Sequence, residues 1–129
     1  MRVWISQLRR GLLEFCLLNL LRRGENYGYG IVQELERIHE LSVSESTVYP
    51  ILARLKQEGF LRVRKTVSPG GPPRRYFSLT GAGEAYTAEM NRYWDGLIQA
   101  VEALRFPHPQ NPPTTDDTSR SADQQATRR

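Results

Sequence analysis

The stretch from residue 44 to residue 57 carries hydrogen-bonding side chains on one face of a predicted helix. Apolar residues at helical intervals form the opposite, buried face, namely Val48, Ile51, Leu52 and Leu55. The polar face has almost no Glu or Lys and consists of Ser46, Thr47, Tyr49, Pro50, Ala53, Arg54 and Gln57. Short side chains let a backbone approach another molecule, and hydroxyl, amide and guanidinium groups bind base edges and phosphates. This composition predicts a face that docks against another molecule.

Catalytic or metal-binding chemistry has few candidate side chains. Cys16 falls in an apolar segment, where an inert buried thiol is expected. His39 ends a predicted helix, where it would interact with the helix dipole, and His108 lies in a proline-rich tail. The sequence contains no P-loop, dinucleotide fingerprint or zinc-ligand spacing. We therefore expect no enzyme activity, no cofactor and no metal.

Positive charge is concentrated in one short region. Residues 62–75 include no acidic residue and five basic ones, Arg62, Arg64, Lys65, Arg74 and Arg75. The flanking segments 61–67 and 75–79 alternate in polarity around a Gly/Pro loop, which predicts a β-hairpin. A basic ribbon suits contact with a row of phosphates. The alternative is an edge hairpin whose charge only prevents aggregation.

Length and composition predict one domain with an anionic partner. The chain has 129 residues, a net charge of +4 and one cysteine, which excludes an intrachain disulfide. The apolar run 12–21 is too short to span a bilayer. A signal peptide is the alternative interpretation of that run, although no small-residue cleavage site follows it. We expect a cytoplasmic protein with no membrane partner.

The first two predicted helices precede the polar one. The first covers residues 7–22, and its nearly all-round apolar segment LLEFCLLNLL predicts burial against several neighbours, including a second subunit. The second follows the turn at residues 27–30, with Ile31, Leu35 and Ile38 as its buried stripe.

The third helix is the polar one described above. Ser44 or Ser46 is its N-cap, and Gly59 ends it. Two helices, a third with a polar outer face and a hairpin follow the order of a winged helix-turn-helix. The predicted fold is therefore mainly α with a small β-hairpin wing.

A fourth helix, capped by Thr80, extends to about residue 104. It carries apolar residues at alternating steps of four and three, as in a coiled-coil seam: Tyr86, Met90, Tyr93, Leu97, Ala100 and Leu104. Trp94, Ile98 and Val101 form a second stripe beside it. Two stripes need two neighbours, so we expect a homodimer; the alternative is that both stripes pack inside one monomer.

Three domains follow from these elements. We expect a DNA-binding winged helix-turn-helix over residues 1–80 and a dimerisation helix over residues 81–105. Residues 106–129 contain many prolines and few apolar groups, which predicts a disordered tail.

Three motifs lie in separate parts of the chain: YGYGI at residues 27–31, STVYPILARL with EGFL at residues 46–61, and GPPRRYFSLT at residues 71–80. In these motifs the chain resembles the PadR family of transcriptional regulators. With the leucine-rich first helix, the resemblance covers about residues 7–105. The chain is similar to the short branch of the family, which lacks a separate C-terminal helical domain.

The resemblance implies a homodimer that binds a palindromic operator, usually as a repressor. In such a dimer the last helix packs against the partner's first and last helices, which adds Leu12 to the expected interface. Some short members bind flat aromatic compounds at this interface, and Trp94 and Phe15 match their stacking and pocket-lining positions. Planar aromatic cations or neutral planar molecules would suit such a slot.

The expected DNA contacts combine the first motif, the polar helix face and the wing. They are Tyr29, Ser44, Ser46, Thr47, Tyr49, Arg54, Gln57, Arg64, Lys65, Arg74 and Arg75. The alternative function is a winged-helix protein-interaction module without specific DNA binding. Such a module does not need a basic wing, so the charge of residues 62–75 favours double-stranded DNA.

Overall fold

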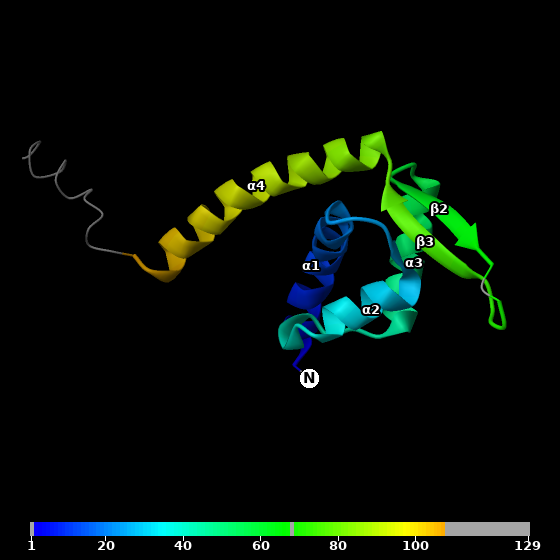
Figure 1. Cartoon of the computed structure of the whole chain (residues 1–129). Coiled ribbons are helices and arrows are strands. Elements are labelled where there is room, and N and C mark those ends of the chain that lie inside the picture. The colour runs from blue at the N-terminus through cyan, green and yellow to red at the C-terminus, as the bar shows by residue number, and fades with distance from the viewer. Residues whose placement is uncertain (1, 68, 108–129) are drawn as a thin grey trace, which may run out of the picture. The chain divides into compact units, whose positions relative to one another are not determined.

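The computed structural model describes residues 2–67 and 69–107 (Figure 1). Its elements are α1 (Val3–Arg22), β1 (Asn26–Tyr27), α2 (Gly28–Glu36), a 3₁₀ turn (His39–Leu41), α3 (Glu45–Gln57), β2 (Leu61–Thr66), β3 (Arg74–Leu79) and α4 (Gly81–Arg105). The chain divides into two compact units, Met1–Asn91 and Arg92–Arg129, which are described separately. Most of the expected tail, from residue 108 onward, lies outside the described residues.

The predicted fold class is confirmed, with one strand more than expected. The strands form an antiparallel sheet in the order β1-β3-β2. In the register of the hairpin, Val63 lies opposite Phe77 and Lys65 opposite Arg75. The added strand, β1, places Asn26 opposite Phe77 and Tyr27 opposite Tyr76. Two residues are too few for an alternating pattern, so no local pattern indicates this strand.

One apolar core joins α1, α2, α3 and the sheet within the first unit. Its buried members are Leu13, Leu17, Leu18, Leu21, Ile31, Val32, Leu35, Val48, Leu52, Leu55, Leu61, Phe77 and Leu79. The prediction for Ile38 was wrong, because α2 ends at Glu36 and this side chain is 46% exposed. The core fixes α3 by its apolar face and leaves the polar face outward.

Helix boundaries differ from the expected ones in two places. α1 begins at Val3, about one turn before residue 7. α2 begins at Gly28, inside the YGYG motif rather than after it. A Cβ at Gly28 would lie 2.5 Å from Cε1 of Tyr49, so any other residue at this position would displace the Tyr49 ring.

Hydroxyl side chains mark the starts of α3 and α4. Ser44 is the N-cap residue of α3, but its hydroxyl bonds the hydroxyls of Ser46 and Thr47 rather than a backbone N–H. Thr80 caps α4 as predicted, because its Oγ1 accepts a hydrogen bond from the Gly83 N–H at 3.0 Å. No helix in the described part of the chain has the length and apolar character needed to cross a membrane.

Candidate nucleic-acid interface

The outward face of α3 carries the side chains that the sequence assigned to it. Ser46, Thr47, Ala53 and Gln57 are exposed, whereas Tyr49 is half-buried. A helix turns by about 100° per residue, so residues 47 and 49 lie on opposite flanks of α3. Tyr49 lies on the flank toward the sheet, and Thr47 lies on the flank toward α1.

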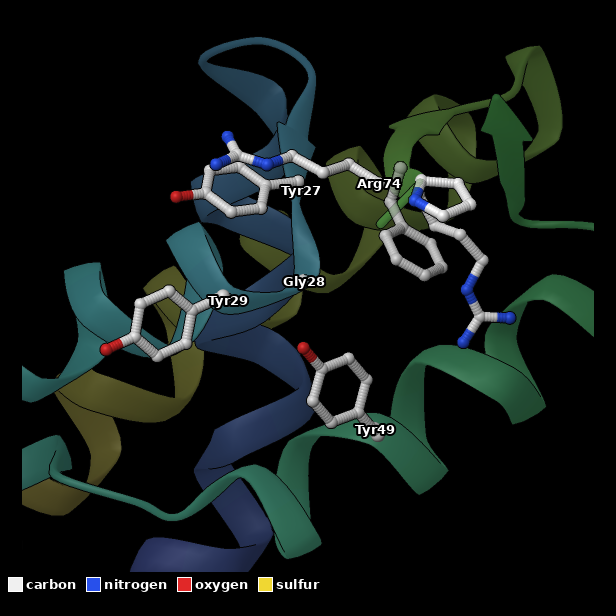
Figure 2. A pocket seen from close by; sticks show the side chains of 8 residues that line it. Tyr27, Gly28, Tyr29, Tyr49 and Arg74 are labelled. Carbon is white, nitrogen blue, oxygen red and sulfur yellow. The ribbon is translucent and has the colours of Figure 1, made fainter. Parts of the chain in front are cut away.

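A hollow lies where α2, α3 and the wing meet (Figure 2). Its volume is about 610 Å³, and it is lined by Tyr27, Gly28, Tyr29, Tyr49, Pro73, Arg74, Arg75 and Phe77. The hydroxyl of Tyr49 points toward Gly28 at the start of α2. The N-cap residue of α2 makes no side-chain cap hydrogen bond. Phenol groups, two arginines and a helix start make this hollow suitable for an anion.

The protonation of Tyr49 supports the same chemistry. Burial raises the pKa of its phenol, with a smaller contribution from Glu45, while Arg75 acts in the opposite direction. The phenol therefore stays protonated near neutral pH. It can donate a hydrogen bond to an anionic oxygen in the hollow.

The basic residues of the wing are divided between the two faces of the sheet. Alternation places Lys65 and Arg75 on the face that carries buried Phe77, and Arg62, Arg64 and Arg74 on the other. Lys65 and Arg75 are direct partners in the β2–β3 register. Like charges placed opposite each other are unfavourable. An anion bound between these two side chains would relieve that repulsion.

The outer face of the wing contains arginines stacked on aromatic rings. The guanidinium carbon of Arg74 lies 4.6 Å from the ring centroid of Tyr27. Figure 2 shows this guanidinium beside the Tyr27 ring. That of Arg64 lies 5.0 Å from the ring centroid of Tyr76. Stacking holds the two side chains in fixed orientations.

Arg64 also forms a two-pronged ion pair with Glu25. Its Nε donates to Oε2 at 3.0 Å, and its Nη2 donates to Oε1 at 2.7 Å. The hydrogen bond from Arg64 lowers the pKa of Glu25. An expected DNA contact is thus already paired with a carboxylate of the same chain.

Arg54 has carboxylate partners as well. Its Nη2 donates to Oε1 of Glu14 on α1, and its Nη1 donates to Oε1 of Glu58 at 3.2 Å. Oε2 of Glu14 accepts a hydrogen bond from the Tyr86 hydroxyl at 3.0 Å. Glu14 therefore joins α1, α3 and the first half of α4. The sequence did not indicate this role, because Glu14 is a single charged residue within the apolar run 12–21 and its partners lie far along the chain.

The family follows from a comparison with known proteins. The sequence profile of the PadR-like transcriptional regulator family matches residues 17–89. The chain belongs to this family. The resemblance found in the motifs is therefore confirmed, and the members of the PadR family are transcriptional regulators rather than enzymes.

Relatives of this PadR-family chain include two named regulators. A transcriptional regulator of Mycobacterium tuberculosis is 33% identical over 97 residues, which cover 75% of this chain and 89% of the relative. The negative transcriptional regulator PadR of Bacillus subtilis is 33% identical over 75 residues, covering 57% of this chain and 41% of the relative. The match thus covers most of the first relative and less than half of the second.

Solved structures of PadR-family proteins share the fold. A regulator from Eggerthella lenta is 30% identical with a TM-score of 0.72, and the match covers 81% of this chain and 91% of that one. Bacillus subtilis PadR in complex with operator DNA is 30% identical with a TM-score of 0.57, covering 61% of this chain and 46% of that one.

The expected dimer and effector residues of this PadR-family chain lie in both units. In the first unit, Tyr86 and Met90 pack against the core, and the Tyr86 ring stacks on Phe60 with centroids 4.1 Å apart. In the second unit, Tyr93 is 71% and Leu104 is 81% exposed. Leu97 and Ala100 are exposed as well. Leu12 and Phe15 on α1 and Trp94 on α4 are half-buried.

Proposed function

We propose that this PadR-family protein is a sequence-specific DNA-binding regulator. The observation that carries the proposal is the basic, phenol-lined hollow beside α3, on a fold shared with Bacillus subtilis PadR bound to operator DNA. In this proposal α3 enters the major groove and the wing contacts the sugar-phosphate backbone.

The geometry supports different roles for the expected DNA-contact residues. Ser46, Thr47 and Gln57 are exposed on α3 and would read base edges. Tyr49, Lys65 and Arg75 would bind a phosphate on the wing side, and Ser44, Tyr29 and Arg74 would add to backbone contact. Arg54 and Arg64 would contribute by positioning α3 and the wing, since both are paired with carboxylates.

We further propose that the regulator acts as a homodimer and a repressor. The exposed apolar side chains of the second unit, among them Tyr93, Leu97 and Leu104, would be covered by a second copy. A two-fold dimer reads a palindrome whose half-sites are about one helical turn apart, or a multiple of it. A dimer bound at a promoter would exclude RNA polymerase.

The proposed effector is a planar aromatic molecule at the dimer interface. Trp94 and Phe15 support this part through the family resemblance, and both rings are half-buried in the single chain. The sequence has two tryptophans, so Trp4→Phe leaves Trp94 as the sole indole. Titrating Trp4→Phe with a library of planar aromatic compounds should quench its fluorescence. If no compound of the library quenches it, the effector part fails.

Selection of duplexes followed by fluorescence anisotropy tests DNA binding. The protein would select duplexes from a random library, and the enriched sequence would be titrated at two salt concentrations with random duplex as competitor. Tight, salt-sensitive binding that survives the competitor is the expected result. Absence of any enriched sequence, with equal affinity for all duplexes, would favour the protein-interaction module instead.

A further inference from the structure

A second hollow lies on the other flank of α3, against the N-terminal half of α1. Its volume is about 200 Å³, and its lining residues are Ser6, Arg9, Arg10, Leu13, Ser42, Val43 and Thr47. We call the first hollow, where α2, α3 and the wing meet, the wing hollow. Thr47 lies on the flank opposite Tyr49, so the two hollows border α3 from opposite sides. The two arginines of α1 were not among the contacts expected from the sequence.

The guanidinium of Arg9 is held in place at this hollow. Its Nη1 donates to the carbonyl of Ser42 at 3.2 Å. Its Nε is buried and has no hydrogen-bond partner among the described residues. A buried donor without a partner is uncommon in folded proteins and calls for an explanation.

The positive charge of this hollow is not compensated within the described residues. Neither Arg9 nor Arg10 forms an ion pair there, in contrast to Arg54 and Arg64. None of its lining residues is acidic. The acid that opens α3, Glu45, acts on Tyr49 at the other flank.

We propose that Arg9 and Arg10 form a seat for a backbone phosphate of DNA, on the side of α3 away from the wing. The proposal rests on the proposed function. The major groove is bounded by two sugar-phosphate backbones, so a helix inside it has a row of phosphates on each side. The wing contacts one row, and the arginines of α1 contact the other.

The first turn of α3 adds to this seat. The Ser44 hydroxyl is bonded to the hydroxyls of Ser46 and Thr47, so it caps no backbone N–H of that turn. The Thr47 N–H already donates to the Ser44 carbonyl at 3.1 Å. The N–H groups that precede it in this turn and the helix dipole favour an anion beside the two arginines.

The salt dependence of DNA binding tests the seat. Arg10→Ala removes an exposed side chain, and Arg23→Ala is the matched control, since it removes an exposed arginine from the other end of α1. Loss of one phosphate contact should reduce the slope of log K against log salt by about 0.9 and weaken binding roughly fivefold to tenfold near 0.1 M salt. The loss should be similar for the enriched and the random duplex.

Three other results would each overturn the proposal that Arg9 and Arg10 bind a backbone phosphate. First, Arg10→Ala could show the same slope of log K against log salt as wild type and as Arg23→Ala. Second, Arg10→Ala and Arg23→Ala could both lose slope by the same amount. Third, inorganic phosphate could raise the melting temperature of wild type but not of Arg10→Ala, while the salt dependence of DNA binding is the same in both. The two arginines would then bind a free anion rather than DNA. Arg10→Glu repeats the measurement with a reversed charge, and melting curves show that each variant is folded. Failure of the proposed function looks different, because wild type itself would then prefer no sequence.

Discussion

Tyr49 owes its position to the absence of a side chain at Gly28. A Cβ there would lie 2.5 Å from Cε1 and 2.7 Å from Oη of the phenol ring. Gly28→Ala should therefore displace the ring and destabilise the fold by about 0.5–1.5 kcal/mol, the cost of an off-rotamer side chain, because the obstacle is the end of a side chain and not backbone. Denaturant unfolding measures this. The cost should shrink when Tyr49→Ala is also present; an equal cost in both backgrounds would mean that the ring is not the obstacle.

The wing arginines should differ in their contribution to DNA binding. Arg75 borders the hollow beside α3, whereas Arg62 lies on the other face of the same hairpin. Arg75→Ala together with Arg74→Ala should weaken binding to every duplex and reduce the salt dependence, because two phosphate contacts are lost. Arg62→Ala is the control for charge alone. If the control weakens binding half as much as the double variant in anisotropy titrations, only net charge matters.

The ion pair between Glu25 and Arg64 predicts a pH effect with a definite sign. Arg64 lowers the pKa of Glu25 in the folded state, so the pair stabilises the fold above the ordinary glutamate pKa of about 4.3. That stabilisation is lost as the pH falls through the lower folded value. Arg64→Ala should raise the pKa of Glu25 toward the ordinary value in an NMR titration. An unchanged pKa would exclude this ion pair in solution.

At the scale of elements, the first turn of α4 rests on the segment that follows α3. A Cβ at Gly83 would collide with the backbone carbonyl of Phe60, which cannot move aside as a side chain could. Gly83→Ala should therefore destabilise the protein by about 1–3 kcal/mol. At Gly96, in the same helix, such a Cβ would have no atom of the described residues within 4 Å, so Gly96→Ala should stabilise by up to about 1 kcal/mol. Thermal unfolding of both variants checks the opposite signs.

Elements with a repeated pattern could be predicted from the sequence, and short or irregular ones could not. The buried face of α3 and the alternation of β2 and β3 extend over several repeats, and both were found. The strand β1 has two residues, and Ile38 lies beyond the end of α2, where helical periodicity no longer applies. Periodicity assigns a face only while the element continues.

The sequence predicted which polar side chains α3 exposes, but not which charged side chains form ion pairs. The polar residues of α3 are exposed as expected. The pairs Arg54–Glu14 and Arg64–Glu25 join residues about 40 positions apart, so no local pattern indicated them. The arginines of α1 were missed for the same reason, since only the fold places them beside Thr47.

At the scale of the whole molecule, the proposed dimer can be tested by one substitution. Leu97 is exposed in the second unit and belongs to the predicted seam, so Leu97→Glu would place charges at the centre of the interface. Sedimentation should then give monomers or aggregates, with operator affinity lost as well. Gln99→Glu introduces the same charge on another face of α4 and should leave a dimer. An intact Leu97→Glu dimer would locate the interface elsewhere.

The pairing of β1 with β3 makes β3 a central strand, hydrogen-bonded on both of its edges. The middle of β3 is therefore joined to the segment that connects α1 and α2, so the wing cannot swing as a free hairpin would. Amide hydrogens of Tyr76 and Phe77 should exchange with deuterium nearly as slowly as those of the core helices. A wing that is ordered in advance loses little conformational entropy when it meets its target, so its contribution to affinity is largely retained.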